Sequence, residues 1–311
     1  MRATVFGASG FIGRYVVRRL AAEGWTVVAA VRHPDEALFL KPMGDVGQIT
    51  PVRASVTDEE SATAAIAGSD AVINLVGILY EHGSQRFEAV HHEGARRVAR
   101  LARAAGAKRL VQISAIGADP GSKSAYARTK ALGEAAARAE FPGATILRPS
   151  IVFGPEDDFF NRFAILARIL PALPLIGGGQ TRFQPVYVAD VAEAVEKALA
   201  DDATAGRTFE LGGPRVYSFA DLMRLLLDQI GRRRLLLPMP FALARMKAWF
   251  LEKLPVPPLT RDQVTLLETD NVCSVNGLPE LGIRPTAVEA IIPTYLDRFR
   301  KGNTLSARLY R

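Results

Sequence analysis

Residues 6–17 read FGASGFIGRYVV, and this stretch joins a strand-like segment to a helix-like one. The segment before it, residues 2–7 (RATVFG), is short and largely apolar, which is typical of a buried strand. Residues 11–24 carry apolar side chains at helical spacing. Three glycines therefore occupy the turn between a strand and a helix, namely Gly7, Gly10 and Gly13.

This glycine turn suits a phosphate ligand. Glycine permits a tight turn, lets the backbone approach a pyrophosphate, and lets the helix pack closely on the strand. The helix N-terminus offers free N–H groups and a partial positive charge to the phosphates. We expect the backbone of Ser9, Phe11 and Ile12 to line the same cradle. A glycine-rich turn without a ligand remains the alternative.

The alternation of strand-like and helix-like segments continues to about residue 150. The further strand-like runs are 25–32, 70–77, 108–115 and 144–154, and the helix-like segments are 58–68, 86–106 and 124–140. Such alternation predicts a parallel sheet with helices on both faces. With right-handed crossovers, the fold class is α/β with a doubly wound parallel sheet, a Rossmann fold.

A smaller C-terminal lobe is expected after this core. The pattern loosens, and proline-rich stretches appear at 170–179, 235–240 and 254–259. We assign residues 1–150 to the NAD(P)-binding Rossmann core and 151–311 to an interleaved C-terminal lobe. The basic tail beyond Pro293 is expected to dock on a partner.

Composition narrows the class of protein. The chain of 311 residues has a formal net charge of +7, no apolar run long enough to span a membrane, and one cysteine, Cys273. Its four histidines have no metal-ligand spacing with Cys273, so no metal site is expected. The basic residues are spread over many segments, which argues against nucleic acid and leaves an anionic cofactor or membrane surface. The start at Met1 predicts a cytosolic-side chain without a signal peptide.

The end of the second strand predicts the type of dinucleotide. Arg32 stands where a dinucleotide fold faces the adenosine ribose, and His33 follows it. An acidic residue there would bind a 2′-hydroxyl, whereas a basic one suits a 2′-phosphate. The sequence therefore favours NADPH, although a solvated arginine at a strand end would look the same.

Further cofactor contacts are expected where two other strands end. Asn74, Val76 and Gly77 close the strand-like run 70–77, where the backbone would pass the adenosine half. Pro149 and Ser150 follow a strand that would end beside the nicotinamide.

Three side chains form a candidate catalytic set. Tyr126 and Lys130 are four residues apart on one predicted helix and therefore share a face. A lysine ammonium favours the phenolate of a neighbouring tyrosine, and Ser114 at the end of the preceding strand would polarise a carbonyl. The alternatives are an accidental surface pair, or vestigial residues that hold the nicotinamide ribose.

Together these motifs resemble a known family. The GASGFIG turn, Tyr126-x-x-x-Lys130 and RPSIVFGPED (148–157) resemble the short-chain dehydrogenase/reductase superfamily, in its extended or atypical branch. Within it, the chain is similar to the NAD(P)H-binding accessory subunits of respiratory complex I, of the alpha-subcomplex subunit 9 type. This likeness extends over nearly the whole chain, including 237–250 and 259–264.

The resemblance implies a function and a location. It implies a subunit that holds NADPH without turnover, contacts other complex I subunits, and supports assembly or stability of the peripheral arm. It implies a peripheral position on the cytoplasmic face of a bacterial inner membrane. The chain departs from active reductases at Ser55, where many relatives have an aspartate that contacts adenine.

A membrane contact is also predicted. Residues 241–254 (FALARMKAWFLEKL) read as a helix with bulky apolar residues and basic flanks, and the stretch 237–254 could lie on a membrane surface or in a partner's groove. The alternative is an ordinary core helix.

Three functions remain open on these residues. The first is the nucleotide-loaded accessory subunit, which the family likeness implies is non-catalytic, and the second is a free-standing NADPH-dependent reductase or epimerase. The third is a redox-sensing regulator that binds NADP(H). All three require the same glycine turn and accommodate Tyr126 and Lys130.

Overall fold

The computed structural model describes residues 1–300, and these residues form two compact units. Unit 1 comprises 1–149, 188–211 and 274–284, and the remaining described residues form unit 2. The predicted docking tail begins within helix α10 (Val288–Leu296), and its last part, 301–311, lies outside the described residues.

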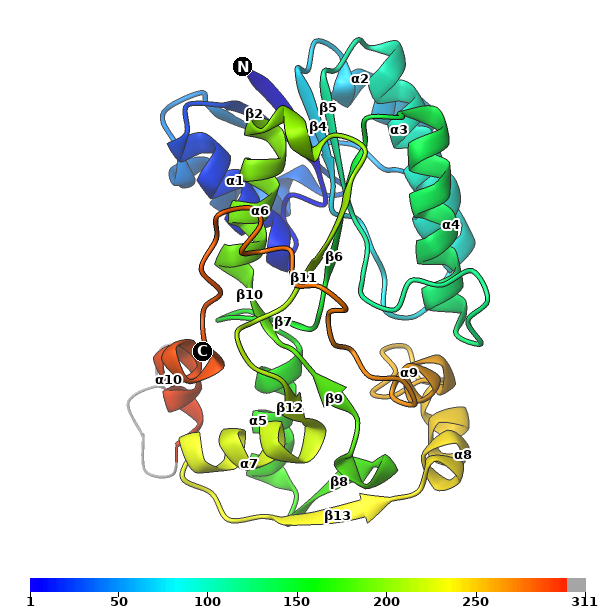
Figure 1. Cartoon of the computed structure of the whole chain (residues 1–311), viewed down its shortest axis with the longest axis vertical. Helices are drawn as coiled ribbons and strands as arrows, with labels where there is room; N and C mark the ends of the chain where they lie inside the picture. The colour runs from blue at the N-terminus through cyan, green and yellow to red at the C-terminus, as the bar shows by residue number, and fades with distance from the viewer. Residues whose placement is uncertain (301–311) are drawn as a thin grey trace. The chain divides into compact units, whose positions relative to one another are not determined.

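A parallel sheet forms the centre of unit 1 (Figure 1). Its order is β11-β6-β5-β4-β1-β2-β3, and each strand is parallel to its neighbours. The strands are β1 (Arg2–Phe6), β2 (Thr26–Val31), β3 (Ile49–Arg53), β4 (Ala71–Asn74), β5 (Arg109–Ile113), β6 (Thr145–Pro149) and β11 (Thr208–Leu211). The chain reverses its direction of travel across the sheet between β1 and β4, which is where doubly wound folds bind ligands. The predicted α/β fold class is confirmed.

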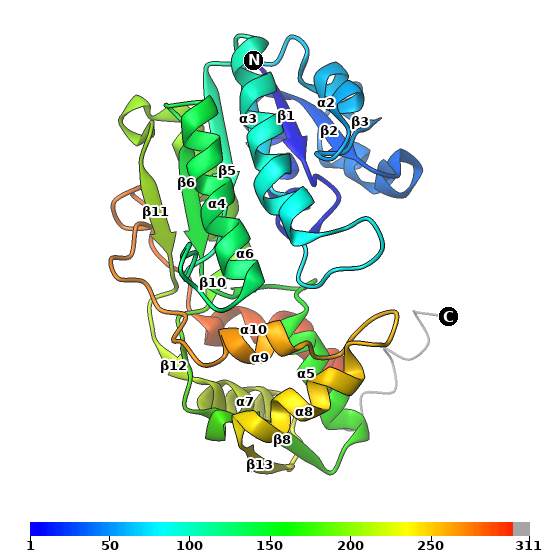
Figure 2. The same ribbon diagram turned by 90° about the vertical axis from the view of Figure 1, so that its right-hand side faces the viewer.

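Helices cover both faces of this sheet. The helices of unit 1 are α1 (Phe11–Ala22), α2 (Glu59–Ile66), α3 (Gly94–Ala104), α4 (Ala125–Glu140) and α6 (Val188–Ala200). Helix α3 packs against α2 and α4, and Figure 2 shows α3 and α4 side by side in front of the sheet. Helix α1 packs against α6. Apolar side chains from the strands and from α2, α3 and α4 fill one continuous core.

Shorter helical turns complete unit 1. Two are 3-10 turns, η1 (Pro34–Met43) and η4 (Asp202–Thr204). The third, η2 (Glu88–Glu93), is a π-helical turn that leads directly into α3.

Unit 2 is built from short strand pairs and helices around an aromatic core. Its pairs are β7 (Val152–Phe153) with β10 (Val186–Tyr187), β9 (Arg182–Phe183) with β12 (Tyr217–Ser218), and β8 (Ala172–Ile176) with β13 (Leu235–Met239). Its longer helices are α5 (Phe159–Ile169), α7 (Phe219–Gln229), α8 (Phe241–Leu251), α9 (Arg261–Leu266) and α10. Phe159 contacts the rings of Phe160, Phe163 and Phe219 at centroid distances of 5.2, 5.3 and 6.2 Å.

The structure differs from the sequence expectations in three elements. Strand β3 was not predicted, because its sequence ITPVR contains a proline and little apolar periodicity; as an edge strand it accommodates Pro51. The helix predicted over 86–106 is instead the π-turn η2 followed by α3. The strand predicted over 144–154 is two strands, because β6 pairs with β11 in unit 1 and β7 pairs with β10 in unit 2.

The division of the C-terminal half is also more complex than a boundary at residue 150. Residues 188–211 and 274–284 belong to unit 1. Strand β11 pairs with β6 there, and α6 packs on α1. The remaining C-terminal segments form unit 2.

Candidate functional site

The glycine turn lies between β1 and α1, as the sequence predicts. Gly7 has a φ of 77°, in the left-handed region that favours glycine. A Cβ on Gly13 would lie 2.1 Å from the Gly7 carbonyl oxygen, so the close contact between helix and turn requires glycine. Gly10 is the N-cap of α1 and provides no side-chain hydrogen bond. The first N–H groups of the helix, at Phe11 and Ile12, are therefore left for another acceptor.

Basic side chains follow strand β2 and occur in the first turn of α1. Arg32 follows the last residue of β2 and is exposed, and His33 is the N-cap of η1. From α1, the guanidinium of Arg14 lies 5.0 Å from the ring centroid of Phe39, which belongs to η1. The sequence analysis did not single out Arg14, because an arginine on the first turn of an amphipathic helix usually faces solvent.

The loop after β4 owes its shape to Asn74. This side chain is buried; its Nδ2 donates to Gln112 Oε1 at 2.9 Å, and its Oδ1 accepts from the Val76 amide at 3.2 Å. Both polar ends of Asn74 are thus committed to the protein itself. The loop brings Gly77 next to Lys130, because a Cβ on Gly77 would lie 3.1 Å from Lys130 Nζ.

The structure brings Tyr126 and Lys130 together on helix α4. This helix begins after Ser124, whose side chain accepts a hydrogen bond from the Ala127 amide at 3.2 Å. Lys130 Nζ lies 5.9 Å from the Tyr126 ring centroid and donates to the Ile113 carbonyl at 3.4 Å. Burial lowers the pKa of Lys130 to about 8, against the opposing effect of the Glu134 carboxylate.

Ser114 lies directly after β5, next to the residue that Lys130 contacts. Its amide donates to the Leu147 carbonyl at 2.8 Å, which continues the sheet pairing. Its Oγ is buried and has no hydrogen-bond partner among the described residues. A buried hydroxyl without a partner is costly, so this oxygen is a group that a bound ligand would satisfy.

His91 is a site residue that the sequence analysis missed. It lies in the π-turn η2, is 3% exposed, and packs against the rings of Phe87 and Tyr126 at centroid distances of 5.3 Å each. Burial, together with the nearby charge of Lys130, lowers the pKa of His91 to about 2. In the sequence, His91 was assessed only as a metal ligand, by its spacing from Cys273. No sequence pattern predicted the π-turn that points its side chain inward.

Pro149 and Ser150 mark the passage from one unit to the other. Pro149 ends β6, and its carbonyl accepts from the Ile116 amide at 3.1 Å. Ser150 belongs to unit 2, where its buried Oγ donates to the side-chain oxygen of Asn271 at 2.6 Å. The assignment of both residues to the cofactor stays a prediction.

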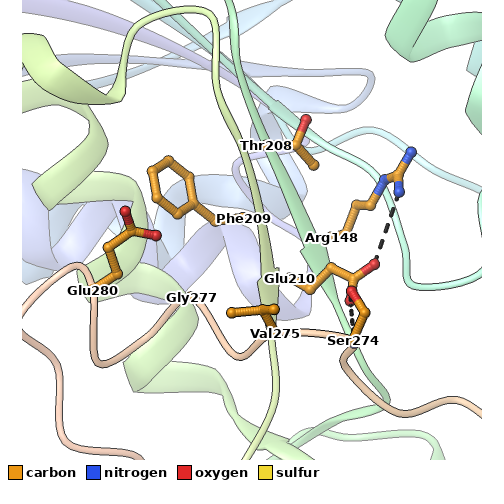
Figure 3. A pocket seen from close by; sticks show the side chains of 8 residues that line it. All are labelled: Arg148, Thr208, Phe209, Glu210, Ser274, Val275, Gly277 and Glu280. Atoms are coloured by element: carbon orange, nitrogen blue, oxygen red, sulfur yellow. Dashed lines mark hydrogen bonds and ion pairs between the residues drawn. The ribbon is translucent and has the colours of Figure 1, made fainter.

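A separate cavity of about 300 Å³ lies at the β11 edge of unit 1 (Figure 3). Its polar side chains are already paired. Arg148 binds Glu134 through two hydrogen bonds of 2.8 and 2.7 Å, and Glu210 accepts from the amide and hydroxyl of Ser274 at 2.7 and 2.9 Å. These contacts fasten the segment 274–284 to the sheet and leave no feature that points to a ligand.

The bulky residues of the predicted membrane helix are exposed. On α8, Met246, Trp249 and Phe250 are 55%, 44% and 61% exposed, whereas Ala244 and Ala248 are fully buried. Lys253 Nζ lies 3.7 Å from the Trp249 ring centroid. The alternative of an ordinary core helix therefore does not hold for these bulky residues. No helix among residues 1–300 is long and apolar enough to cross a membrane.

The residues fit a dinucleotide. The helix N-terminus lacks a side-chain cap at Gly10, and Ser114 Oγ lacks a partner in the described part of the chain. For a metal, the described residues offer one group, Glu88, His92 and Glu93. These side chains are partly or fully exposed, and His92 Nδ1 and Glu88 Oε1 already share a hydrogen bond of 2.5 Å.

Known proteins are similar to this chain, two of them over nearly its whole length. The chain is 38% identical to the mitochondrial NADH dehydrogenase [ubiquinone] 1 alpha subcomplex subunit 9 of Arabidopsis thaliana, over 96% of this chain and 78% of that protein. The mouse protein of the same name is 36% identical, over 99% and 82%. A ceramide reductase of Caulobacter vibrioides is 33% identical over 60% of this chain and 57% of that protein.

Solved structures share the fold. The dTDP-glucose 4,6-dehydratase DesIV of Streptomyces venezuelae, with NAD and TYD bound, superposes with a TM-score of 0.75 at 21% identity, over 96% of each chain. Residues 3–212 match the model of the NAD dependent epimerase/dehydratase family. The chain belongs to the NAD dependent epimerase/dehydratase family and, within it, to the family of the alpha subcomplex subunit 9 proteins.

Proposed function

We propose that this protein is a nucleotide-loaded accessory subunit of a respiratory NADH:ubiquinone oxidoreductase. The observation that carries the proposal is that the likeness to the alpha subcomplex subunit 9 proteins includes unit 2. The family model ends at residue 212, whereas the Arabidopsis and mouse relatives match 96% and 99% of the chain. Most of unit 2 lies beyond the nucleotide-binding family match and is shared with these relatives.

The cofactor that we propose is NADPH. A bound nicotinamide supplies a hydride donor or acceptor. Gly7, Gly10 and the first turn of α1 would hold the pyrophosphate, and Arg32 would bind the 2′-phosphate. Lys130 and Tyr126 would hold the nicotinamide ribose, and the unpartnered Ser114 Oγ would accept or donate a hydrogen bond at that end.

The exposed face of α8 supports a peripheral position at a membrane. Three bulky apolar side chains project from one helix, and Lys247 and Lys253 add positive charge beside them. Such a helix binds anionic lipid surfaces by apolar burial and by charge. We further propose that this membrane is a bacterial inner membrane, with the protein at its cytoplasmic face against the other subunits of the complex.

Membership of the complex is tested on mildly solubilised membranes. A native gel is probed for this protein and for NADH dehydrogenase activity in one band, with the wild type and a Trp249→Ser/Phe250→Ser variant. We expect the wild type to co-migrate with a large active band and the variant to do so less. Val46→Ser, which changes an exposed apolar residue of unit 1, is the matched control. A single small species for the wild type would overturn the proposal.

Cofactor choice is tested by reversing the charge at the proposed phosphate site. Arg32→Asp should weaken NADPH binding by about a hundredfold and leave NADH binding unchanged or stronger, because a carboxylate repels a 2′-phosphate and accepts from a 2′-hydroxyl. Isothermal titration gives both affinities. Arg233→Asp makes the same charge change at an exposed position of unit 2 and should alter neither. Equal loss of both cofactors in Arg32→Asp would contradict NADPH selection.

A second function is favoured by the catalytic end of the site. Ser114, Tyr126 and Lys130 have the residue types of a reductase, and burial lowers the pKa of Lys130 to about 8. The partial likeness to a ceramide reductase is compatible with this function. Long-chain ketones are therefore offered with NADPH, and its absorbance is followed. Turnover that disappears in Tyr126→Phe and Ser114→Ala would establish an enzyme. If NADPH binds but is not oxidised, the accessory-subunit function is retained.

A further inference from the structure

We infer that His91 is a positioning residue. It connects the loop after β4 to helix α4 and thereby determines how tightly the nicotinamide half of the cofactor is bound. The inference rests on the proposed cofactor site. His91 is the residue whose two ring nitrogens reach both of these elements.

The hydrogen bonds fix the tautomer of His91. Its Nε2 accepts from the Ile78 amide at 3.0 Å, so Nε2 carries no proton. Its Nδ1 lies 3.1 Å from Thr129 Oγ1, and that hydroxyl donates to the Ala125 carbonyl at 2.8 Å. Nδ1 therefore carries the proton and donates it to Thr129. The ring is a neutral link with one acceptor end and one donor end.

Protonation of His91 would break this link. A proton on Nε2 would face the Ile78 amide, which is also a donor, and would add a positive charge near Lys130. The same burial and the same Lys130 charge hold the pKa of His91 far below its usual range. A buried imidazole with both ring nitrogens in hydrogen bonds acts through its position.

The hydrogen bonds of His91 hold Gly77 close to Lys130. Ile78 follows Gly77, and Lys130 follows Thr129, so His91 joins the neighbours of the two groups that meet at the proposed ribose site. A Cβ on Gly77 would lie 3.1 Å from Lys130 Nζ and 3.8 Å from His91 Nε2. Tyr126 packs edge-on against the same imidazole. Loss of the ring would let the loop and α4 separate where the nicotinamide ribose would bind.

The test compares a whole cofactor with its adenosine half. NADPH uses both halves of the proposed site, whereas 2′,5′-ADP uses the glycine turn and Arg32. In His91→Ala, we expect NADPH affinity to fall by about tenfold and 2′,5′-ADP affinity to stay within about twofold of the wild type. Glutamine at 91 can place an amide oxygen near the position of Nε2, so His91→Gln should recover most of the NADPH affinity. Thr129→Val, which removes the other partner, should lose about threefold.

The outcomes separate this inference from the proposed function. Equal losses for NADPH and 2′,5′-ADP in His91→Ala would make His91 a purely structural residue. Failure of the wild type to bind either ligand would overturn the cofactor site itself, and the inference with it. If His91→Ala does not fold, nitrogen NMR of the wild type decides: we expect an Nδ1–H tautomer that does not titrate between about pH 5.5 and 7.5. An Nε2–H tautomer, or titration in that range, would overturn the inference.

Discussion

Helix α4 of unit 1 and helix α8 of unit 2 both depart from the amphipathic pattern that is usual for a surface helix, but in opposite ways. Helix α4 buries charge, since Lys130 and Glu134 are 6% and 3% exposed. Helix α8 buries only the small side chains of Ala244 and Ala248 and turns Trp249 and Phe250 outward. In an ordinary amphipathic helix, apolar residues face the core and charged residues face water.

The difference teaches how to separate the structural residues from the functional ones. Glu134 has a partner inside unit 1, because Arg148 forms two hydrogen bonds with it. The hydrogen bond from Lys130 to the Ile113 carbonyl is long, at 3.4 Å. The outward face of α8 gains nothing from the fold that exposes it. Lys130 and the outward face of α8 are therefore the stronger candidates for contact with a ligand or a partner.

The largest change in stability is expected at the hydrogen-bonded pair of Arg148 and Glu134. Arg148→Met leaves the Glu134 carboxylate buried without its partner, and we expect the free energy of unfolding to fall by about 3 kcal/mol. Urea denaturation measures it. The double variant Arg148→Met/Glu134→Met removes both charges and should recover much of this loss. If the single and double variants were equally stable, Glu134 would not depend on Arg148, and the contrast with Lys130 would fail.

A gain in stability, rather than a loss, is expected on replacing Lys130. Lys130→Met removes a charge that burial disfavours, so the ligand-free protein should gain about 2 kcal/mol of stability while NADPH affinity falls. Destabilisation by this variant would show that the lysine supports the fold, and α4 would then hold no residue kept for a ligand.

The pH dependence of this gain follows from the lowered pKa. Below about pH 8, Lys130 is charged in both folded and unfolded chains, and the folded protein bears the full cost of burial. Between pH 8 and 10.5, the usual pKa of lysine, the folded protein releases the Lys130 proton before the unfolded chain does, so the cost disappears as pH rises. The stability difference between Lys130→Met and the wild type should therefore shrink over this range. A constant difference would mean that charge burial is not its cause.

The smallest effects on stability are expected at the exposed face of α8. Phe250→Ser should change the free energy of unfolding by less than about 0.5 kcal/mol, because the side chain is 61% exposed. Ala248→Leu adds apolar surface on the buried face and should cost about 1 kcal/mol through overpacking. Binding to anionic vesicles should fall in Phe250→Ser and persist in Ala248→Leu. The reverse order in either assay would mean that α8 is oriented differently in solution.

Much of unit 1 was predictable from the sequence. The glycine turn, the alternating apolar runs and the i, i+4 spacing of Tyr126 and Lys130 are local signals, and each was read within a short window. Strand β3 was missed because an edge strand with Pro51 has no such signal. Unit 2 was predicted only as a loose lobe, since its two-residue strands are defined by pairing between distant segments such as Tyr217 and Phe183.

The site was predictable where one motif defined it. His91 lies 38 residues from Thr129, and its inward direction depends on a π-turn that packs against Gly133 of α4. The lack of a partner for Ser114 Oγ and the exposure of α8 depend on everything that surrounds them. These are properties of the packed molecule that no window of sequence contains.

The pairing of β11 with β6 has a consequence for the chain during its synthesis. When residue 150 leaves the ribosome, β6 is an open edge with a row of unpaired backbone groups, and β11 lies about sixty residues further along the chain. Even after β11 arrives, the segment 274–284 that fastens it is still to be made. An open edge strand is a template for pairing with another nascent chain. This edge of the nascent sheet therefore stays open at least until β11 has been synthesised.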